Sequence, residues 1–482
     1  MKQLFRFSFL VLALMLPALV SAYDFEVDGI YYNIDGNEAA VTSKGDYYDM
    51  YFVGYLGSVV IPPTVTYNGT TYPVTSIDEI AFYCCEGLTS VDIPSSITKI
   101  GNFAFGNCPV LTSIVVESGN PRFDSRNNCN AIIETASNTL IAGCKNTMIP
   151  NSVTKIGNFA FEGCDGLTSI VIPNSVTAIG NKAFYNCDGL TSINIPNSVT
   201  SIGNNVFESC DELTGLVVES GNPRYDSRNN CNAIIETADN TLIVGCKNTM
   251  IPNSVTSIGN FAFSYCRGLT SIIIPNSVTA IGKCAFESCI GLTSVDIANS
   301  VTSIGRYAFY NCQGLTSINI PNSVTEIGDN AFYWCDGLTS IVIPNSVTSI
   351  GNEAFKNCWM LTDVYCYIAD LSGVSCGNEQ FYKEYNGNYS GRTLHVLQGT
   401  ADAYRADENW YPYFGQIVED LIPETPSGDV NGDLEVNIAD VNAVINMIMV
   451  GNDSTSVADV NGDGEINIAD INAVIDIILS GS

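Results

Sequence analysis

The feature that most constrains this chain is a segment of 23 residues that recurs along most of its length. One copy runs from Leu167 to Gly189 and reads LTSIVIPNSVTAIGNKAFYNCDG; its first leucine recurs 23 residues later as Leu190. The same step joins a further series of leucines: Leu88 to Leu111, Leu190 to Leu213, and Leu269 through Leu292, Leu315 and Leu338 to Leu361. A fixed period of about 20 to 50 residues indicates a solenoid, in which each unit contacts only its neighbours.

Each unit carries the apolar spacing of one coil. A leucine and two isoleucines alternate as in a strand, a Pro-Asn-Ser and a Gly-Asn segment mark turns, and Ala-Phe-x-x-Cys has the spacing of a single helical turn. Only neighbouring coils can bury these side chains, so one unit cannot fold alone. The expected inward-facing residues are Leu167, Ile170, Ile172, Val176, Ile179, Ala183, Phe184 and Cys187. Outward slots, such as Val171, are left for function.

Two steps in the leucine series are longer than the rest. Leu111 to Leu167 and Leu213 to Leu269 each span 56 residues, which is one repeat of 23 plus an insert of 33. The two inserts have nearly the same text, and the NAIIETA and NTLI segments within each predict a β-hairpin. Two cysteine pairs flank the hairpins and are either disulfides or free thiols: Cys129 with Cys144, and Cys231 with Cys246.

The pattern LTSIxIPNSVTxIGxxAFxxCxGL resembles the BspA-type leucine-rich repeat, over about residues 60 to 420. The resemblance implies a mainly β, right-handed solenoid, with a parallel sheet on one side and short helical or irregular turns on the other. Ten leucine anchors and one extra coil for each insert predict about 12 coils. BspA-like proteins are surface adhesins, so the resemblance also implies an extracellular protein or glycan as the partner of the solenoid.

The chain holds 18 cysteines, which in an exported protein suggests a disulfide framework. Ten of them, however, occupy one slot of the repeat, which favours buried small apolar side chains. Bridges between coils stay possible by geometry, because coils one strand spacing apart, about 4.8 Å, bring Cα atoms within bridging range. The ten are Cys85, Cys108, Cys164, Cys187, Cys210, Cys266, Cys289, Cys312, Cys335 and Cys358. Cys366 and Cys376 form a third candidate pair.

The chain begins with the features of an export signal. Lys2 and Arg6 precede an apolar run that closes on Val20-Ser21-Ala22, which predicts a signal peptide cleaved after Ala22. No later stretch reaches the roughly 18 apolar residues of a membrane span. We therefore expect a secreted protein that only a partner molecule would hold at a cell surface. Its 50 acidic against 19 basic residues, a net charge of -31, argue against nucleic acid or anionic membranes as partners.

Two related segments near the end of the chain have the spacing of calcium loops. DVNGDLEVNIAD starts at Asp429 and DVNGDGEINIAD starts 30 residues later at Asp459, so oxygen-bearing side chains recur at loop positions 1, 3, 5, 9 and 12. Ca²⁺ takes six to eight such oxygens in flexible geometry, with a backbone carbonyl at position 7. We predict two Ca²⁺ ions, with Asp429, Asn431, Asp433, Glu435, Asn437 and Asp440 at the first, and Asp459, Asn461, Asp463, Glu465, Asn467 and Asp470 at the second.

Each loop is followed but not preceded by an apolar helix, and residues 429 to 482 thereby resemble a type I dockerin. The resemblance implies a cohesin partner, selected in part by loop positions 10 and 11, here Ile438-Ala439 and Ile468-Ala469. These pairs either offer two near-equivalent docking faces or pack against the other half of the domain. The segment holds ten acidic side chains and no Lys or Arg, so we expect it to fold only with calcium. Leu434, where the second loop has Gly464, predicts a weaker first site.

Motifs of catalysis are not found. The single histidine, His395, lies in an apolar segment, and no zinc helix, nucleophile elbow or phosphate loop occurs. Sequence alone leaves open a carboxylate pair for glycoside hydrolysis. Aromatic residues gather in the later repeats, where they either stack on a sugar or protein ligand or cover the coil edges. This candidate ligand face comprises Tyr310, Tyr333, Trp334, Trp359 and Tyr365.

The chain is therefore expected to be an exported, non-catalytic binding or adhesion protein whose dockerin docks onto a cohesin-bearing surface or complex. The alternative is an accessory or enzymatic component of an extracellular polysaccharide-degrading complex. The expected parts are the signal peptide (1–22), an N-terminal cap with a first partial repeat (23–87), the repeats (88–360) with inserts near 117–149 and 219–251, a C-terminal cap (361–420), a linker (421–428) and the dockerin (429–482).

Overall fold

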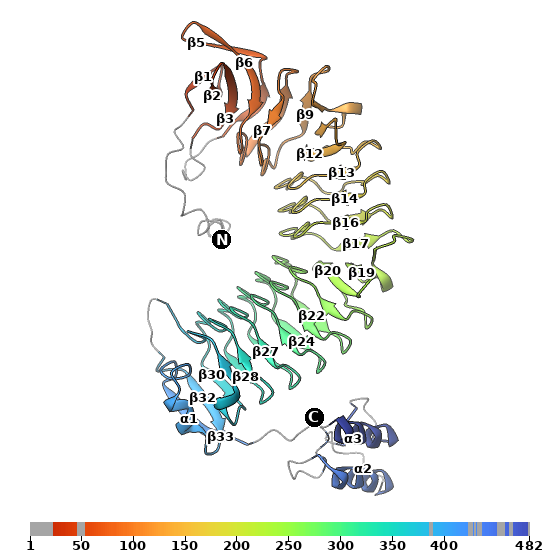
Figure 1. The fold of residues 1–482 in the computed structure, drawn as a ribbon, viewed down its shortest axis with the longest axis vertical. Coiled ribbons are helices and arrows are strands. Elements are labelled where there is room, and N and C mark those ends of the chain that lie inside the picture. The colour runs from red at the N-terminus through yellow and green to blue at the C-terminus, as the bar shows by residue number, and fades with distance from the viewer. Residues whose placement is uncertain are drawn as a thin grey trace.

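A computed structural model describes residues 23–45, 54–384, 389–422, 428, 430, 436–450, 458–461 and 466–480. The segment expected to be the signal peptide lies outside these ranges. The coils stack side by side into a curved array that runs from β7 to β30 (Figure 1). The fold is a mainly β solenoid, as expected, of about 15 turns. No helix within the described residues is long and apolar enough to cross a bilayer.

The estimate of 12 coils was too low because both segments expected to be caps extend the array. Strand β4 pairs in parallel with β7, which is the first full repeat strand. At the other end, the parallel sheet continues through β30, β32 and β33 although the 23-residue period fails after Leu361. The N-terminal strands are β1 (Phe25–Val27), β2 (Ile30–Asp35), β3 (Glu38–Thr42), β4 (Leu56–Val60), β5 (Thr64–Tyr67), β6 (Thr70–Ile77), β7 (Gly87–Ile93), β8 (Lys99–Ile100) and β9 (Ser113–Val116).

A typical coil carries two short strands, each in parallel register with the same strand of the next coil. Ile193 in the longer strand lies opposite Leu216, and Ile281 in the two-residue strand lies opposite Ile304. The longer strands are β15 (Ser192–Ile195), β17 (Gly215–Val218), β22 (Ser271–Ile274), β24 (Ser294–Ile297), β26 (Ser317–Asn319), β28 (Ser340–Ile343) and β30 (Asp363–Cys366). The two-residue strands are β13 (Lys155–Ile156), β14 (Ala178–Ile179), β16 (Ser201–Ile202), β21 (Ser257–Ile258), β23 (Ala280–Ile281), β25 (Ser303–Ile304), β27 (Glu326–Ile327), β29 (Ser349–Ile350) and β31 (Ser375–Cys376).

The third side of the coil is not the helical turn that the Ala-Phe-x-x-Cys spacing predicted. Residues 181–186 form consecutive turns, with left-handed φ values at Lys182 (52°) and Asn186 (56°). The N–H groups of both residues donate to carbonyls of the next coil, those of Asn204 and Glu208, at 2.9 Å. A helix would direct these N–H groups along its own axis. Bonding between coils therefore replaces helical bonding, at the cost of two left-handed residues per coil.

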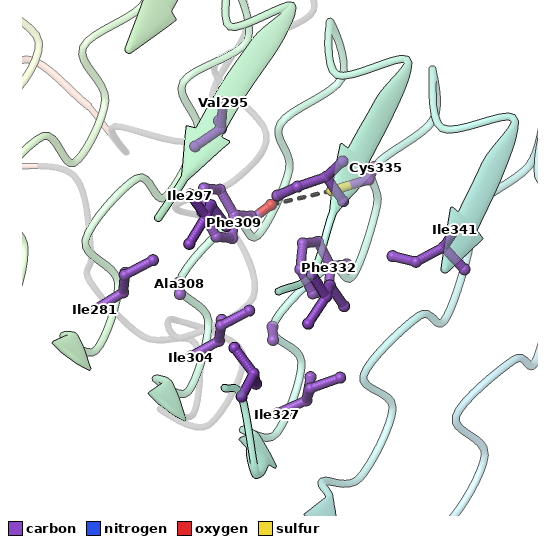
Figure 2. Close-up of a cluster of buried hydrophobic side chains, with 14 of the residues drawn as sticks. Ile281, Val295, Ile297, Ile304, Ala308, Phe309, Ile327, Phe332, Cys335 and Ile341 are labelled. Atoms are coloured by element: carbon purple, nitrogen blue, oxygen red, sulfur yellow. Dashed lines mark hydrogen bonds between the residues drawn. The ribbon is translucent and has the colours of Figure 1, made fainter. Parts of the chain in front are cut away.

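The core is a stack of identical side chains, as the repeat predicted. The rings of Phe286, Phe309 and Phe332 lie parallel, with centroids 5.2 and 5.3 Å apart, and are fully buried. The thiol of Cys335 donates to the Phe309 carbonyl at 3.1 Å, which satisfies that oxygen inside the core (Figure 2). Most of the repeat cysteines donate in the same way to a carbonyl of the preceding coil, as Cys187 does to Phe161 at 3.1 Å, and pack as small apolar residues.

The inserts form the hairpins that their sequences predicted, and each divides the core. Strands β11 and β12 pair antiparallel, and β12 then joins the parallel sheet through β13. A Cβ on Gly143 would lie 2.2 Å from the ring of Phe161, so this insert glycine takes the place of a stacking ring. A Cβ on Gly245 in the second insert would likewise lie 2.0 Å from the ring of Phe263. The insert elements are β10 (Phe123–Asp124), η2 (Arg126–Asn128), β11 (Ala131–Glu134), β12 (Thr139–Gly143), β18 (Tyr225–Asp226), η3 (Arg228–Asn230), β19 (Ala233–Glu236) and β20 (Thr241–Gly245).

Beyond β30 the array is closed by aromatic packing. The fully buried indole of Trp410 lies 5.5 Å from the Phe381 ring and ends the phenylalanine stack. The terminal helix expected here is only the short α1. The closing elements are η4 (Leu371–Gly373), β32 (Thr393–Leu397), α1 (Ala401–Ala406) and β33 (Gln416–Leu421). The segment expected to be a dockerin holds the helices α2 (Ile438–Val450) and α3 (Ile468–Ser480).

Candidate functional site

The described part of the dockerin contains two equivalent buried carboxylates. Asp440 and Asp470 lie in the first turns of α2 and α3, at loop position 12, and both are fully buried. The carboxylate of Asp440 accepts the N–H groups of Val430 and Asn437, both at 2.8 Å. Asp470 accepts those of Asn461 (3.1 Å) and Asn467 (2.8 Å). Each carboxylate therefore ties the start of its helix to its loop.

These residues suit a calcium ion. Burying a carboxylate is costly unless a positive charge is close, and residues 429 to 482 contain no Lys or Arg. Carboxylate and amide oxygens, which are the ligands that Ca²⁺ prefers, lie at Asn437, Asp440, Asp459, Asn461, Asn467 and Asp470. The remaining predicted ligands, Asp429, Asn431, Asp433, Glu435, Asp463 and Glu465, lie outside the described residues.

The residues predicted to meet a cohesin lie at equivalent places on the two helices. Ile438 and Ile468, the first residues of α2 and α3, are 68% and 71% exposed. Ala439 is exposed and Ala469 half-buried. The helices instead pack together through buried residues such as Val444 and Val474. Among the described residues, the isoleucines are therefore not part of the packing that holds the two halves together.

The candidate ligand face is brought together only in part. Tyr310 lies 5.5 Å from Tyr333 and 5.8 Å from Trp334, so three of the five rings form one cluster. Both tyrosines are half-buried, and burial raises the pKa of Tyr333 to about 12. Trp334 and Trp359, in adjacent coils, are 36% and 37% exposed. Trp334 is thus the accessible ring of this cluster, and Trp359 is a separate exposed ring in the next coil.

Tyr365 belongs to a different surface. It lies in β30, where its ring stacks on His395 of β32 with centroids 4.4 Å apart. His395 Nδ1 is 2.8 Å from an Asp420 carboxylate oxygen, and Nε2 is 3.2 Å from Asp363. A histidine held from both sides between strands serves to link β30, β32 and β33.

The three candidate cysteine pairs are not disulfides in the structure, which holds every cysteine as a free thiol. The reason is the division of the core. Cys129 lies in the cluster that follows the first insert, whereas Cys144 lies in the cluster that precedes it. Cys231 and Cys246 are separated in the same way at the second insert. The Cys366 thiol instead lies 3.1 Å from the Tyr404 hydroxyl.

A groove beside the first insert was missed by the sequence reasoning. It has a volume of about 810 Å³ and is lined by residues from the coils on both sides of the insert, among them Lys99, Phe103, Arg122, Lys155 and Phe159. One signal could have found it. The residue before each Ile-Gly pair of the repeats is Lys at only two positions, 99 and 155. These two lysines lie in the coils that flank the first insert.

Comparison with known proteins agrees with this architecture. A model of the BspA type leucine rich repeat region, in six copies, matches residues 66–135, 141–237 and 243–362, and a model of the dockerin type I domain matches residues 427–479. No curated protein is found to match the chain.

Two solved structures illustrate the likeness. The pneumococcal vaccine antigen PcpA is 19% identical, with a TM-score of 0.54 over 83% of this chain and 100% of that one, which supports the fold. A leucine rich cell surface protein from Faecalibacterium prausnitzii is 28% identical, over 72% of this chain and 95% of that one, with a TM-score of 0.47. Because the repeat model matches more than half of its residues, the chain belongs to the BspA-type leucine-rich repeat family and carries a type I dockerin domain after the repeats.

Proposed function

We propose that this chain is an exported, non-catalytic recognition protein. Its solenoid binds an extracellular protein or glycan, and its dockerin attaches it, with two bound Ca²⁺ ions, to a cohesin-bearing surface or complex. Repeat and dockerin domains are interaction modules of non-catalytic types, and proteins that contain them are typically extracellular. The observation that carries the proposal is the dockerin itself, because this domain implies a cohesin partner.

The paired geometry of α2 and α3 supports docking through the isoleucines. Exposed apolar side chains at the centre of a contact are common anchors of protein interfaces. Ile438 and Ile468 are exposed at the same helical position, so either half can present an equivalent surface. A substitution of one isoleucine should therefore change the affinity for a cohesin only slightly, since the other half of the domain can still bind. Substitution of both should abolish binding.

The longer strands supply a surface for the solenoid's ligand. The outward residue of each strand is flanked by two buried ones, and several of these outward residues are apolar. Val115, Val217 and Ile273 in the strands, and Val171 at the equivalent place in its coil, are between 43% and 82% exposed. Exposed apolar side chains repeated along one face of a protein are typical of an interaction surface.

The test is a pull-down of a panel of type I cohesins by the full chain, with calcium and with chelator. We expect at least one cohesin to bind in calcium and to be released by chelator. The double variant I438D/I468D should lose this binding, while each single variant retains it. The matched control is Met250→Asp, at an apolar residue of the second insert that is 67% exposed. Binding that survives both the chelator and the double variant would refute the proposed docking site.

A further inference from the structure

The groove beside the first insert has a charge opposite to that of the chain. Three cationic side chains, Lys99, Arg122 and Lys155, line it, against one carboxylate, that of Glu134. The whole chain has a net charge of -31. Most lysines and arginines of the repeats pair with an acid, as Lys182 does with Glu208 at 3.1 Å. Among the described residues, Lys99 and Lys155 have no such partner, so both charges remain for a ligand.

The insert creates the groove by interrupting the bonding between coils. In regular coils the N–H of the phenylalanine donates to the alanine carbonyl of the next coil, as Phe161 does to Ala183 at 2.8 Å. At the insert, the N–H of Gly143 donates to Ala160 instead, at 2.7 Å. The insert strand thereby stands between Phe105 and Ala160, while the two coils still meet further along, where the Asn107 N–H donates to the Glu162 carbonyl at 2.8 Å. The backbone of residues 101–106 becomes one wall of the groove.

The rest of the lining is aromatic and amide. The rings of Phe103 and Phe159 are half-buried, with centroids 4.4 Å apart. Asn158 and Asn181 are exposed and aligned by bonds between coils, since the Asn158 side-chain oxygen accepts the Asn181 N–H at 2.8 Å. An amide offers both a donor and an acceptor, as does a sugar hydroxyl. Aromatic rings offer an apolar surface for the face of a sugar.

We propose that this groove binds an acidic polysaccharide, through carboxylates of uronate type that meet Lys99 and Lys155. The proposal rests on the proposed recognition function and names its ligand class. An acidic peptide is the less favoured occupant, because strand addition needs a row of backbone groups. The open strand at this edge, β8, has only two residues.

The duplicated block provides a built-in control. Its equivalent residues lie 102 positions later, where Ser201 and Ser257 replace the two lysines and Asn205 replaces Phe103. The second insert keeps the same bonding, with the Gly245 N–H donating to Ala262 at 2.8 Å. Serine at the lysine positions is therefore compatible with folding. Asn at 103 is compatible as well, because Phe103 has a left-handed φ of 58°, which asparagine tolerates.

The experiment measures binding of the full chain to polygalacturonate in calcium at low salt, with fully methyl-esterified polygalacturonate as the uncharged equivalent. We expect the wild-type chain to bind the acid form and not the ester, with an affinity that falls as salt rises. K99S/K155S should weaken this binding at least tenfold. Phe103→Asn should weaken it further, which a purely electrostatic contact would not show. K44S/K283S removes two exposed lysines elsewhere and should leave the affinity unchanged.

Three outcomes would overturn the assignment. Equal binding by K99S/K155S and the wild-type chain would mean that the groove is not the site, while glycan recognition by the solenoid would stand. Preference for poly-glutamate over polygalacturonate would make the ligand an acidic peptide. Failure to bind any acidic glycan would also refute the groove assignment. The cohesin pull-down is independent of all these results, so it judges the docking function separately.

Discussion

The solenoid and the dockerin are stabilised in different ways. In the solenoid, each coil repeats one set of apolar side chains, so Phe309 packs between copies of itself in the neighbouring coils. In the dockerin, a small apolar core around Val444 and Val474 lies beside fully buried carboxylates, in a segment with ten acids and no lysine or arginine. The first region is self-sufficient because stacking buries its core. The second buries carboxylates with no cationic side chain in its sequence, so we expect its folding, and with it the proposed docking, to depend on calcium.

The largest effect is expected from breaking the phenylalanine stack. Phe309→Ala would leave a cavity between two parallel rings and should destabilise the solenoid by about 3–5 kcal/mol. Denaturant unfolding followed by far-ultraviolet circular dichroism measures the change. Calcium titration of the dockerin should be unaffected in the same variant. A loss below about 1 kcal/mol would mean that the coils do not depend on this stack.

A pH-dependent contribution is expected at Glu162, a carboxyl within the solenoid. Burial raises its pKa from 4.5 to about 7. Because the folded-state pKa is the higher one, the folded state holds the proton more tightly, and stability is lost as pH rises from about 4.5 through 7. Glu162→Gln, which still accepts the Tyr83 hydroxyl, should stabilise the solenoid by about 1–3 kcal/mol at pH 8 and by little at pH 4. Thermal unfolding at both pH values provides the test. A gain in stability that is the same at both pH values would show that the raised pKa of Glu162 is not its cause.

The two calcium sites should respond unequally to loss of their buried carboxylates. Asp470→Asn removes a predicted ligand from the loop with Gly464, and Asp440→Asn removes a predicted ligand from the loop with Leu434. We expect each to weaken calcium binding at its own site tenfold or more, which is about 1.4 kcal/mol. The Asp470 variant should lose the tighter site. Isothermal titration with Ca²⁺ distinguishes the two, and equal residual affinities would mean that Leu434 does not weaken the first loop.

The smallest effect is expected on the outward face of the repeats. Val171 is 82% exposed, so Val171→Ser should change stability by less than about 0.5 kcal/mol. The change can therefore be used to test ligand binding without unfolding the coil. Chemical denaturation provides the check, and a loss near 2 kcal/mol would show that this surface contributes to the core.

Much of the solenoid could be predicted because the repeat reports burial directly. All eight expected inward positions from Leu167 to Cys187 are buried. The turn segment was predicted wrongly because its spacing suits one helical turn, whereas the left-handed residues Lys182 and Asn186 direct their N–H groups to the next coil. Periodicity within one unit does not show bonding between units.

The candidate sites were predictable to a lesser extent. The calcium spacing places Asp440 and Asp470 where the structure buries them. The sequence left the cysteine pairs open as disulfides or free thiols, because sequence separation across a hairpin does not show that the insert divides the core, with Cys129 and Cys144 on opposite sides. The groove was missed because it depends on Gly143 displacing a regular contact. Such a gap arises from stacking and is not part of any motif.

The most direct test of the central claim is calorimetry of the full chain with calcium and with chelator, together with limited proteolysis. We expect two unfolding transitions in calcium. Chelator should abolish the smaller transition and expose residues 428–482 to protease, while the transition of the solenoid keeps its temperature. A dockerin that remains folded and resistant to protease without calcium would contradict the account. So would a solenoid whose unfolding temperature falls when calcium is removed.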